Sequence, residues 1–195
     1  MLKVGLIVGS TRPNRFADIP VRWLLQGAQE RRDFEIEVLD LRDVGLPLFA
    51  EPRIPAMAQG VFLEPKAEAW RHRIGACDAF IATVAEYNHG PTAVLKNAFD
   101  SAYLEWQRKP IAFVGYGGVG GARAIEQLRG VAVGLQMAPM RFDVNIAQET
   151  FFAALARAKS LDDFDDLKRS RTVLFDHLVW WGEALSLARA ERIAA

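Results

Sequence analysis

Cysteine and histidine are scarce in this chain of 195 residues, which holds one cysteine and three histidines. A lone cysteine, Cys77, cannot form a disulfide framework or a cysteine-based metal site, and its place before an apolar run favours core packing over catalysis. His72 and His177 fall in helical segments, so a three-histidine site would have to draw on scattered helices. The acidic run at 162–166 lacks the spacing of a calcium-binding loop and precedes a helix, where negative charge is favourable. We therefore expect no metal.

A surplus of charge of one sign is also missing, because 24 Lys and Arg residues balance 24 Asp and Glu residues. Nucleic-acid binding needs a basic face, so nucleic acid is not expected as a partner. No apolar run reaches the roughly 20 residues of a membrane span, and no basic leader precedes the first apolar run, Val4–Val8. With 51% hydrophobic residues, the composition predicts one globular domain over residues 1–195, working in the cytoplasm with no membrane partner.

Apolar runs and helical spacings alternate about five times along the chain, and no repeat interrupts them. The predicted strands are Val4–Val8, Glu35–Leu39, Ala79–Val84, Ile111–Val114 and Arg141–Ile146. The predicted helices lie around 19–24 and over Lys66–Ala76, Thr92–Trp106 and Ala122–Val133, with a long last helix carrying a stripe of Leu167, Leu174, Leu178, Trp181 and Leu185. This alternation indicates an α/β fold with a parallel sheet covered on both faces. Such sheets bind ligands at the carboxyl ends of their strands.

Between these elements, the stretch Leu41–Glu64 carries too many prolines for a helix. We expect a long surface excursion there, and it is a candidate for packing on a second subunit.

The loop after the first strand, Gly9–Phe16, has the groups that hold an anion. Backbone N–H groups at a helix N-terminus attract anions, Ser10 offers a hydroxyl, and Arg12 and Arg15 offer cationic forks. The Walker spacing is absent, which weakens a nucleoside triphosphatase interpretation. Pro20 fits a first helical turn, so regular helix is expected from about Asp18. A plain polar turn with two solvated arginines is the alternative.

The loops after the third and fourth predicted strands are the other candidates. Glu86, Tyr87 and Asn88 place polar and aromatic groups at the sheet edge, whereas a solvent-facing loop position is the favoured interpretation of His89. In the last of these loops, 115–121, the glycines match Gly-x-Gly-x-x-Gly, with Asp143 some twenty residues on. A dinucleotide fingerprint belongs on a first strand, so we favour a loop that lets backbone approach a flat ligand.

Together the three loops resemble the NAD(P)H-dependent FMN reductase family of flavodoxin-like proteins, whose relatives include azobenzene, quinone and chromate reductases. The matching segments are Gly9-Ser10-Thr11-Arg12, then Glu86–Gly90 running into Leu95–Asp100, and Tyr116–Ala124. The resemblance covers roughly Leu2–Ile146 and implies a flavodoxin-like three-layer sandwich. Its five-stranded parallel sheet would have the order 2-1-3-4-5, with helices on both faces.

By this resemblance, Ser10, Arg12, Arg15 and Phe16 would surround the FMN phosphate, and Ala85, Glu86, Tyr87 and Asn88 would border the isoalloxazine. Tyr116, Gly117 and Gly118 would close its other edge. The sequence departs from the family, which often has Ser at the place of Arg15, Asn at Ala17 and Pro at Ala85. No catalytic acid or base is expected, because the flavin itself carries the hydride.

The implied activity is an oxidoreductase that passes a hydride from NADPH or NADH through bound FMN to a small acceptor: a free flavin, a quinone, an azo compound or a metal oxyanion. A flavodoxin-like electron carrier and a dinucleotide-binding protein without reductase turnover are the alternatives. A homodimer or homotetramer is expected, since the predicted helix Thr92–Trp106 carries Phe99, Tyr103 and Trp106 beyond one apolar stripe. The family also pairs through this region.

Overall fold

The parallel sheet forms the middle layer of the computed structural model, which describes residues 1–58 and 60–193. Its strands are β1 (Leu2–Val8), β2 (Phe34–Asp40), β3 (Ala79–Ala85), β4 (Pro110–Tyr116), β5 (Ala138–Pro139) and β6 (Val144–Ile146). The order is β2-β1-β3-β4-β5, with β6 also on β4, and all pairs are parallel. Every residue of β3 and β4 is buried, as continuous apolar runs predict for central strands.

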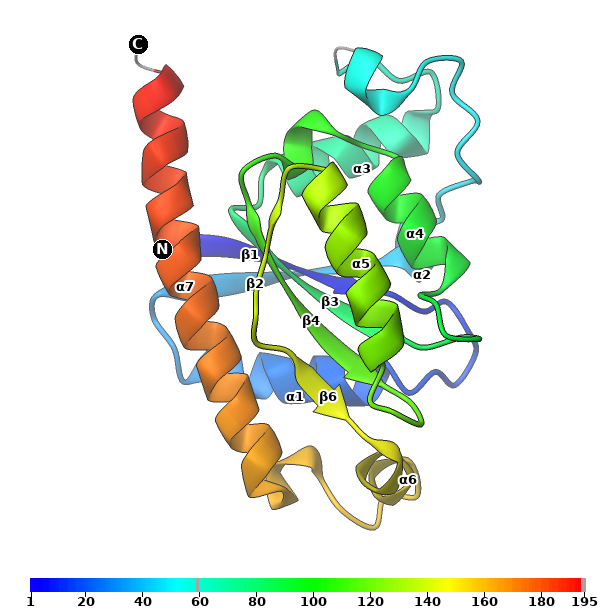
Figure 1. Ribbon diagram of the computed structural model, residues 1–195, viewed down its shortest axis with the longest axis vertical. Helices are drawn as coiled ribbons and strands as arrows, with labels where there is room; N and C mark the ends of the chain where they lie inside the picture. Colours follow the sequence, from blue (N-terminus) through cyan, green and yellow to red (C-terminus); the bar gives the residue numbers. More distant parts are fainter. Residues whose placement is uncertain (59, 194–195) are drawn as a thin grey trace.

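Helices cover both faces of the sheet, so the predicted three-layer sandwich is confirmed (Figure 1). One core packs α1 (Asp18–Gln29), α6 (Gln148–Leu155) and α7 (Asp165–Ile193) onto the sheet. The other packs α3 (Pro65–Gly75), α4 (Ala93–Asp100) and α5 (Ala122–Gly134) onto the opposite face. No helix in the described ranges is long and apolar enough to cross a membrane.

The predicted fifth strand, Arg141–Ile146, is confirmed at its end alone, where β6 forms, and a second short strand, β5, lies before the predicted range. β5 pairs with the start of β4 and β6 with its end, while the residues between them leave the sheet. The N–H groups of Ala138 and Met140 donate to the β4 side, to the carbonyls of Lys109 and Ile111 at 3.0 and 2.8 Å, so Pro139 is tolerated at this edge. The Arg129 guanidinium bonds to the carbonyls of Met140 and Arg141 in the interruption, which stabilises the departure.

The predicted helix Thr92–Trp106 is too long, since α4 ends at Asp100 and a short 3₁₀ turn follows at Leu104–Trp106. The Ser101 hydroxyl donates to the Asn97 carbonyl at 2.7 Å, and the chain then turns so that the Trp106 indole donates to the Phe99 carbonyl at 3.2 Å. Phe99 and Trp106 are thereby buried in the chain's own core. Two of the three aromatic side chains that motivated the oligomer prediction are therefore covered within one chain, while Tyr103 is half-buried, and the oligomer stays a prediction.

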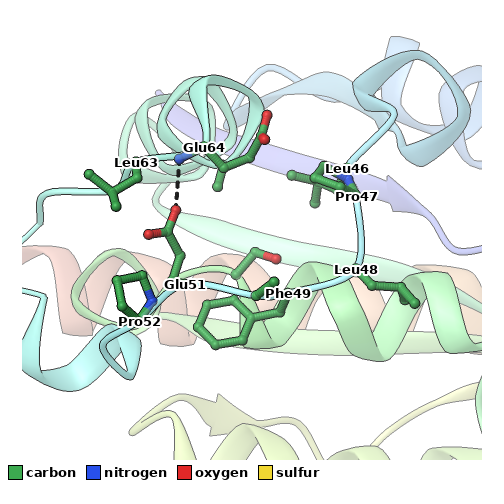
Figure 2. A pocket seen from close by; sticks show the side chains of 11 residues that line it. Leu46, Pro47, Leu48, Phe49, Glu51, Pro52, Leu63 and Glu64 are labelled. Atoms are coloured by element: carbon green, nitrogen blue, oxygen red, sulfur yellow. Dashed lines mark hydrogen bonds between the residues drawn. The ribbon is translucent and has the colours of Figure 1, made fainter.

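The excursion between β2 and α3 has little regular structure, as its prolines predict, apart from α2 (Leu41–Val44) and a 3₁₀ turn at Pro55–Met57. Figure 2 shows the cavity of about 310 Å³ that it forms with the start of α3. Glu51 spans it by accepting a hydrogen bond from the Glu64 N–H at 2.8 Å. Leu48, Ile54, Met57, Val61 and Leu63 are exposed along this segment.

The last helix, α7, follows a 3₁₀ turn at Leu161–Asp163 and runs along the face that β1, β4 and β6 present. Leu167, Leu174 and Leu178 of the predicted stripe are buried, whereas Trp181 is exposed. The predicted apolar stripe is therefore buried along the first half of the helix, and the prediction is wrong at Trp181.

Candidate active site

A cavity of about 310 Å³ opens at the carboxyl ends of β1, β3 and β4, the edge that the sequence indicates. We call it the strand-end cavity. Its lining is Ser10, Arg12, Asn14, Arg15, Phe16, Ala85, Glu86, Tyr87, Tyr116, Gly117, Phe151 and Leu155. Nine of the eleven predicted site residues are among them. Asn88 and Gly118 do not line the cavity, and Asn14, Phe151 and Leu155 were missed.

The first loop presents its backbone donors without partners. Within the described residues, the N–H groups of Ser10, Thr11, Arg12, Asn14, Arg15 and Phe16 donate no hydrogen bond. Helix α1 begins at Asp18 as predicted, and its N-cap residue, Ala17, has no side chain to cap it. Six free N–H groups beside an uncapped helix N-terminus suit a phosphate, so this end of the cavity fits the phosphate of FMN.

Arg15 is engaged by the protein itself. Its guanidinium donates to Asp18 Oδ1 at 2.7 Å, to the Ser10 carbonyl at 2.6 Å and to both carboxylate oxygens of Asp40. Only 5% of its side chain is exposed. Because its donors are committed, Arg15 fixes the shape of the loop from beneath. Arg12 also lines the cavity, and its guanidinium forms no ion pair within the described chain. The guanidinium carbon lies over the Tyr87 ring, 6.0 Å from the ring centroid.

Tyr116 brings a buried polar group into the cavity. Its hydroxyl has no hydrogen-bond partner among the described residues, and burial raises its pKa above the ordinary tyrosine value. The ring packs 5.0 Å from Phe16, between centroids, and stacks 6.4 Å from Phe151. An orphaned buried hydroxyl in a cavity is a second sign that a polar ligand belongs there.

The second loop is a tight turn built on two left-handed residues. Asn88 and His89 have φ of 50° and 70°, and Tyr87 and Gly90 exchange both backbone hydrogen bonds, at 2.9 and 3.0 Å. This is the backbone of a two-residue hairpin turn, in which asparagine is favoured. Asn88 and His89 both face solvent, so the solvent-facing interpretation of His89 is confirmed. Asn88 holds the turn that carries Tyr87.

The third loop needs its glycines for its own packing. A Cβ on Gly115 would lie 2.3 Å from the Gly120 carbonyl oxygen, and one on Gly120 would lie 2.8 Å from the Asn145 side chain. Gly117, Gly120 and Gly121 also have φ values of 136°, 66° and 75°, which favour glycine. These contacts explain the Gly-x-Gly-x-x-Gly match without a dinucleotide.

Glu86 already occupies the helix start that a pyrophosphate would need. Its carboxylate accepts from the Arg123 N–H at 3.2 Å, near the N-terminus of α5, and pairs with the Arg123 side chain. A second anion there would meet a fixed negative charge. Asp143, the other part of the fingerprint, pairs with Arg129 at 2.6 Å and does not line the strand-end cavity.

Phe151 and Leu155 close the cavity from α6, a helix that carries no sequence motif. The Phe151 ring lies 4.3 Å from Phe16, between centroids. Their spacing of four residues, which places both on one helix face, is the single feature of the sequence that could have indicated their shared role.

Over the residues that the structure describes, no group of three His, Cys, Asp or Glu side chains could hold a metal ion.

Comparisons with known proteins identify relatives of this chain. A profile described as NADPH-dependent FMN reductase matches residues 2–150. An NAD(P)H-dependent FMN reductase of Schizosaccharomyces pombe is 36% identical over 135 residues, which cover 69% of this chain and 68% of the relative. One from Saccharomyces cerevisiae is 36% identical over 145 residues, covering 70% and 76%.

Among solved structures, the flavoenzyme NAD(P)H:(acceptor) oxidoreductase FerB from Paracoccus denitrificans superposes with a TM-score of 0.73. It is 23% identical, over 94% of this chain and 98% of its own, and so shows the shared fold. The predicted flavodoxin-like fold is thereby confirmed. The chain belongs to the NADPH-dependent FMN reductase family, a family of oxidoreductases with FMN as cofactor and NAD(P)H as substrate.

Proposed function

We propose that this chain binds one FMN in the strand-end cavity and passes a hydride from NADPH or NADH to a small acceptor: a free flavin, a quinone, an azo compound or a metal oxyanion. The observation that carries the proposal is the meeting of free backbone donors and the orphaned Tyr116 hydroxyl in one cavity. FMN, when bound, supplies the hydride chemistry. The protein's residues bind, orient and shield it.

The first loop is proposed to hold the phosphate. Its N–H groups, the Ser10 hydroxyl and the Arg12 guanidinium are the free donors, and Phe16 packs beneath them. Arg15 neutralises Asp40 and fixes the Ser10 carbonyl, so it keeps the loop open for the anion without binding it. Charge-assisted hydrogen bonds from a preformed loop are the strong ones.

The other two loops are proposed to border the isoalloxazine. Ala85, Glu86 and Tyr87 stand on one side and Tyr116 and Gly117 on the other. Asn88 shapes the turn beneath Tyr87, and Gly118, whose added Cβ would meet nothing within 4 Å, leaves the rim open.

Proton chemistry by the protein is not required. Glu86 is the one carboxylate among the described lining residues, and Arg123 holds it as an ion pair. A hydride that enters and leaves through a bound flavin needs positioning more than an acid or base. This arrangement supports the expectation of no catalytic side chain.

The two alternatives fit less well. An electron carrier steers toward partners with an acidic face, and this chain has a net charge of zero. A dinucleotide on the glycine loop would meet the Glu86 carboxylate at the start of α5.

The deciding experiment is the visible spectrum of the purified protein, followed by anaerobic NADPH titration and then addition of a quinone. Flavin absorbance, bleached by NADPH and restored by the quinone, is the expected result. A colourless protein that does not bind added FMN would overturn the proposal. Arg12→Ala is expected to weaken FMN binding by about 1.5–3 kcal/mol, the scale of a hydrogen bond to a charged group. Arg32→Ala, at an exposed position between α1 and β2, is the matched control.

We further propose a homodimer or homotetramer that works in the cytoplasm. Support for assembly comes from the exposed apolar side chains at 48–63, which a second subunit would cover. Light scattering tests the assembly, since a mass of 21.7 kDa at micromolar protein would contradict it. Cell fractionation tests the location.

A further inference from the structure

A second cavity, of about 550 Å³, lies beside α6. We call it the basic cavity. Its apolar lining is Ile19, Trp23, Ala154 and Leu161, three of them buried. Its cations are Arg22, Arg157 and Lys159. Phe151 and Leu155 of α6 line the strand-end cavity while Ala154 lines this one, so one helix separates the two.

No carboxylate lines the basic cavity, and in the described part of the chain none of its three cations forms an ion pair. Two acids, Asp162 and Asp163, bond to lining residues from behind, and other groups of the chain already engage them. Asp162 accepts from the Trp23 indole at 2.9 Å and pairs with Arg171 at 3.2 Å, while Asp163 accepts from the Ser160 N–H at 2.7 Å. In a chain of zero net charge, this is a local positive surplus.

Arg157 stands in this cavity at a conformational cost. Its φ is 56°, and the N–H groups of Arg157 and Ala158 bond back to the carbonyls of Ala154 and Ala153 at 3.1 and 3.0 Å. This is the left-handed position that closes a helix, where glycine is the usual residue. Backbone conformation alone would favour glycine at this position. The arginine therefore places a cation at the rim of the cavity for a reason other than closing the helix.

We propose that the basic cavity binds a phosphorylated ligand with a flat apolar body, as in a phosphorylated nucleoside. The arginine forks match phosphate oxygens, the apolar floor suits a base, and the volume lies in the range of small-molecule sites. Two sources carry this chemistry. One is the 2′-phosphorylated adenosine end of NADPH, an assignment that rests on the proposed function. The other is a separate phosphorylated ligand.

The first arm of the test measures KM for NADPH and for NADH with the FMN-loaded protein. Arg157→Gln and Lys159→Gln are compared with Arg32→Gln, which removes an exposed charge between α1 and β2 that also has no ion pair in the described residues. If NADPH supplies the phosphate, each cavity variant raises KM for NADPH about tenfold, leaves KM for NADH unchanged, and the control changes neither.

Arg157→Gly separates binding from structure. Glycine relieves the left-handed strain, so Tm is expected to rise by about 2–4 °C while KM for NADPH still rises. A residue with a purely structural role would not give both changes.

The second arm measures inorganic pyrophosphate binding to the FMN-loaded protein by calorimetry, and needs no turnover. Unchanged KM values, with pyrophosphate binding lost in the Arg157→Gln/Lys159→Gln double variant but kept in Arg32→Gln, would assign a separate phosphorylated ligand. The proposal is overturned if neither KM nor pyrophosphate binding responds, or if both coenzymes and the control respond alike. A protein that binds pyrophosphate here but does not oxidise NAD(P)H would sink the proposed function and leave this site standing.

Discussion

Arg15 could either bind the FMN phosphate directly or hold the first loop in its shape. Asp40→Asn, which removes the charge of its ion-pair partner, distinguishes these two roles. If Arg15 were a free phosphate ligand, removing the nearby Asp40 carboxylate would strengthen FMN binding by releasing the guanidinium. If Arg15 instead holds the loop, the same change loosens the loop and weakens FMN binding. The structure favours the second outcome, because Arg15 is also bonded to Asp18 and to the Ser10 carbonyl.

The magnitude follows from the contacts. Asp40→Asn keeps the N-cap bond that Asp40 accepts from the Arg42 N–H at 2.9 Å, since asparagine caps equally well. It removes the charge from a pair whose side chains are 5% and 17% exposed. Hydrogen bonds to charged groups contribute about 1.5–3 kcal/mol, so we expect a loss of about 2 kcal/mol in stability. FMN binding should weaken about tenfold, because the loop must then be ordered on binding.

The dependence on pH gives an independent check. Burial alone would raise the pKa of Asp40, but the hydrogen bond from the Arg15 side chain holds it below its ordinary value. A depressed carboxyl pKa contributes stability above the unfolded value, near 4, and loses it as pH falls through the folded value. The stability gap between wild type and Asp40→Asn should therefore be constant from about pH 5 to 8 and close below about pH 4.

Urea denaturation of the FMN-free protein and fluorescence titration with FMN measure the two effects. Asp43→Asn, an exposed acid on α2, is the control and should change neither. Asp40→Asn with unchanged stability and tighter FMN binding would refute the loop-holding role and make Arg15 a direct phosphate ligand.

Two further predictions concern the rim and the back of the site, and a third concerns Asp143, which lies outside it. Gly118→Val should lower FMN content or shift the flavin spectrum, because the branched side chain stands next to Gly117, which lines the strand-end cavity. It should not unfold the protein, since an added Cβ meets nothing within 4 Å; an unshifted spectrum with a large rise in KM for NAD(P)H would contradict the prediction. Phe151→Ala should speed FMN release in stopped-flow fluorescence, whereas Phe152→Ala, exposed on the same helix, should not; equal rates would remove α6 from the site. Burial raises the pKa of Asp143 to about 6 despite the Arg129 pair, so wild type should lose about 2 kcal/mol relative to Asp143→Asn as pH rises from 4 to 7, and parallel denaturation curves would refute this.

Much of the fold could be predicted because its signals are local. β1, β3 and β4 are apolar runs bounded by glycine or by polar loops, and the alternation of elements implies the parallel sheet. The errors occur where the backbone departs from a continuing apolar pattern. Apolar residues run on past Asp100, but the chain turns so that Trp106 fills the core. The predicted strand Arg141–Ile146 likewise begins too early, because the backbone before Val144 leaves the sheet where Arg129 bonds to the Met140 and Arg141 carbonyls.

The site was predictable as far as its loops follow strands. Ser10, Ala85 and Tyr116 stand at strand ends, and parallel strands bring those ends together. The role of Arg15 was not predictable, since its partner Asp40 lies 25 residues away and reaches it because β1 and β2 align Val8 with Asp40. Phe151 was missed for the same reason, as a contact made by packing leaves no local motif.

The placement of anions at the sheet edge follows from how three helices begin there. Helix α4 is capped by the Thr92 hydroxyl, which accepts from the Leu95 N–H at 3.2 Å. Helix α5 has the Glu86 carboxylate on the Arg123 N–H. Helix α1 begins with Ala17, which has no capping side chain, after a loop of free N–H groups. Backbone donors at a helix start are satisfied by a side chain, by water or by a ligand. Because two of the three starts already have an acceptor from the chain, we propose the start of α1 as the phosphate site. The glycine loop, although it resembles a dinucleotide fingerprint, is then proposed to border the flavin ring.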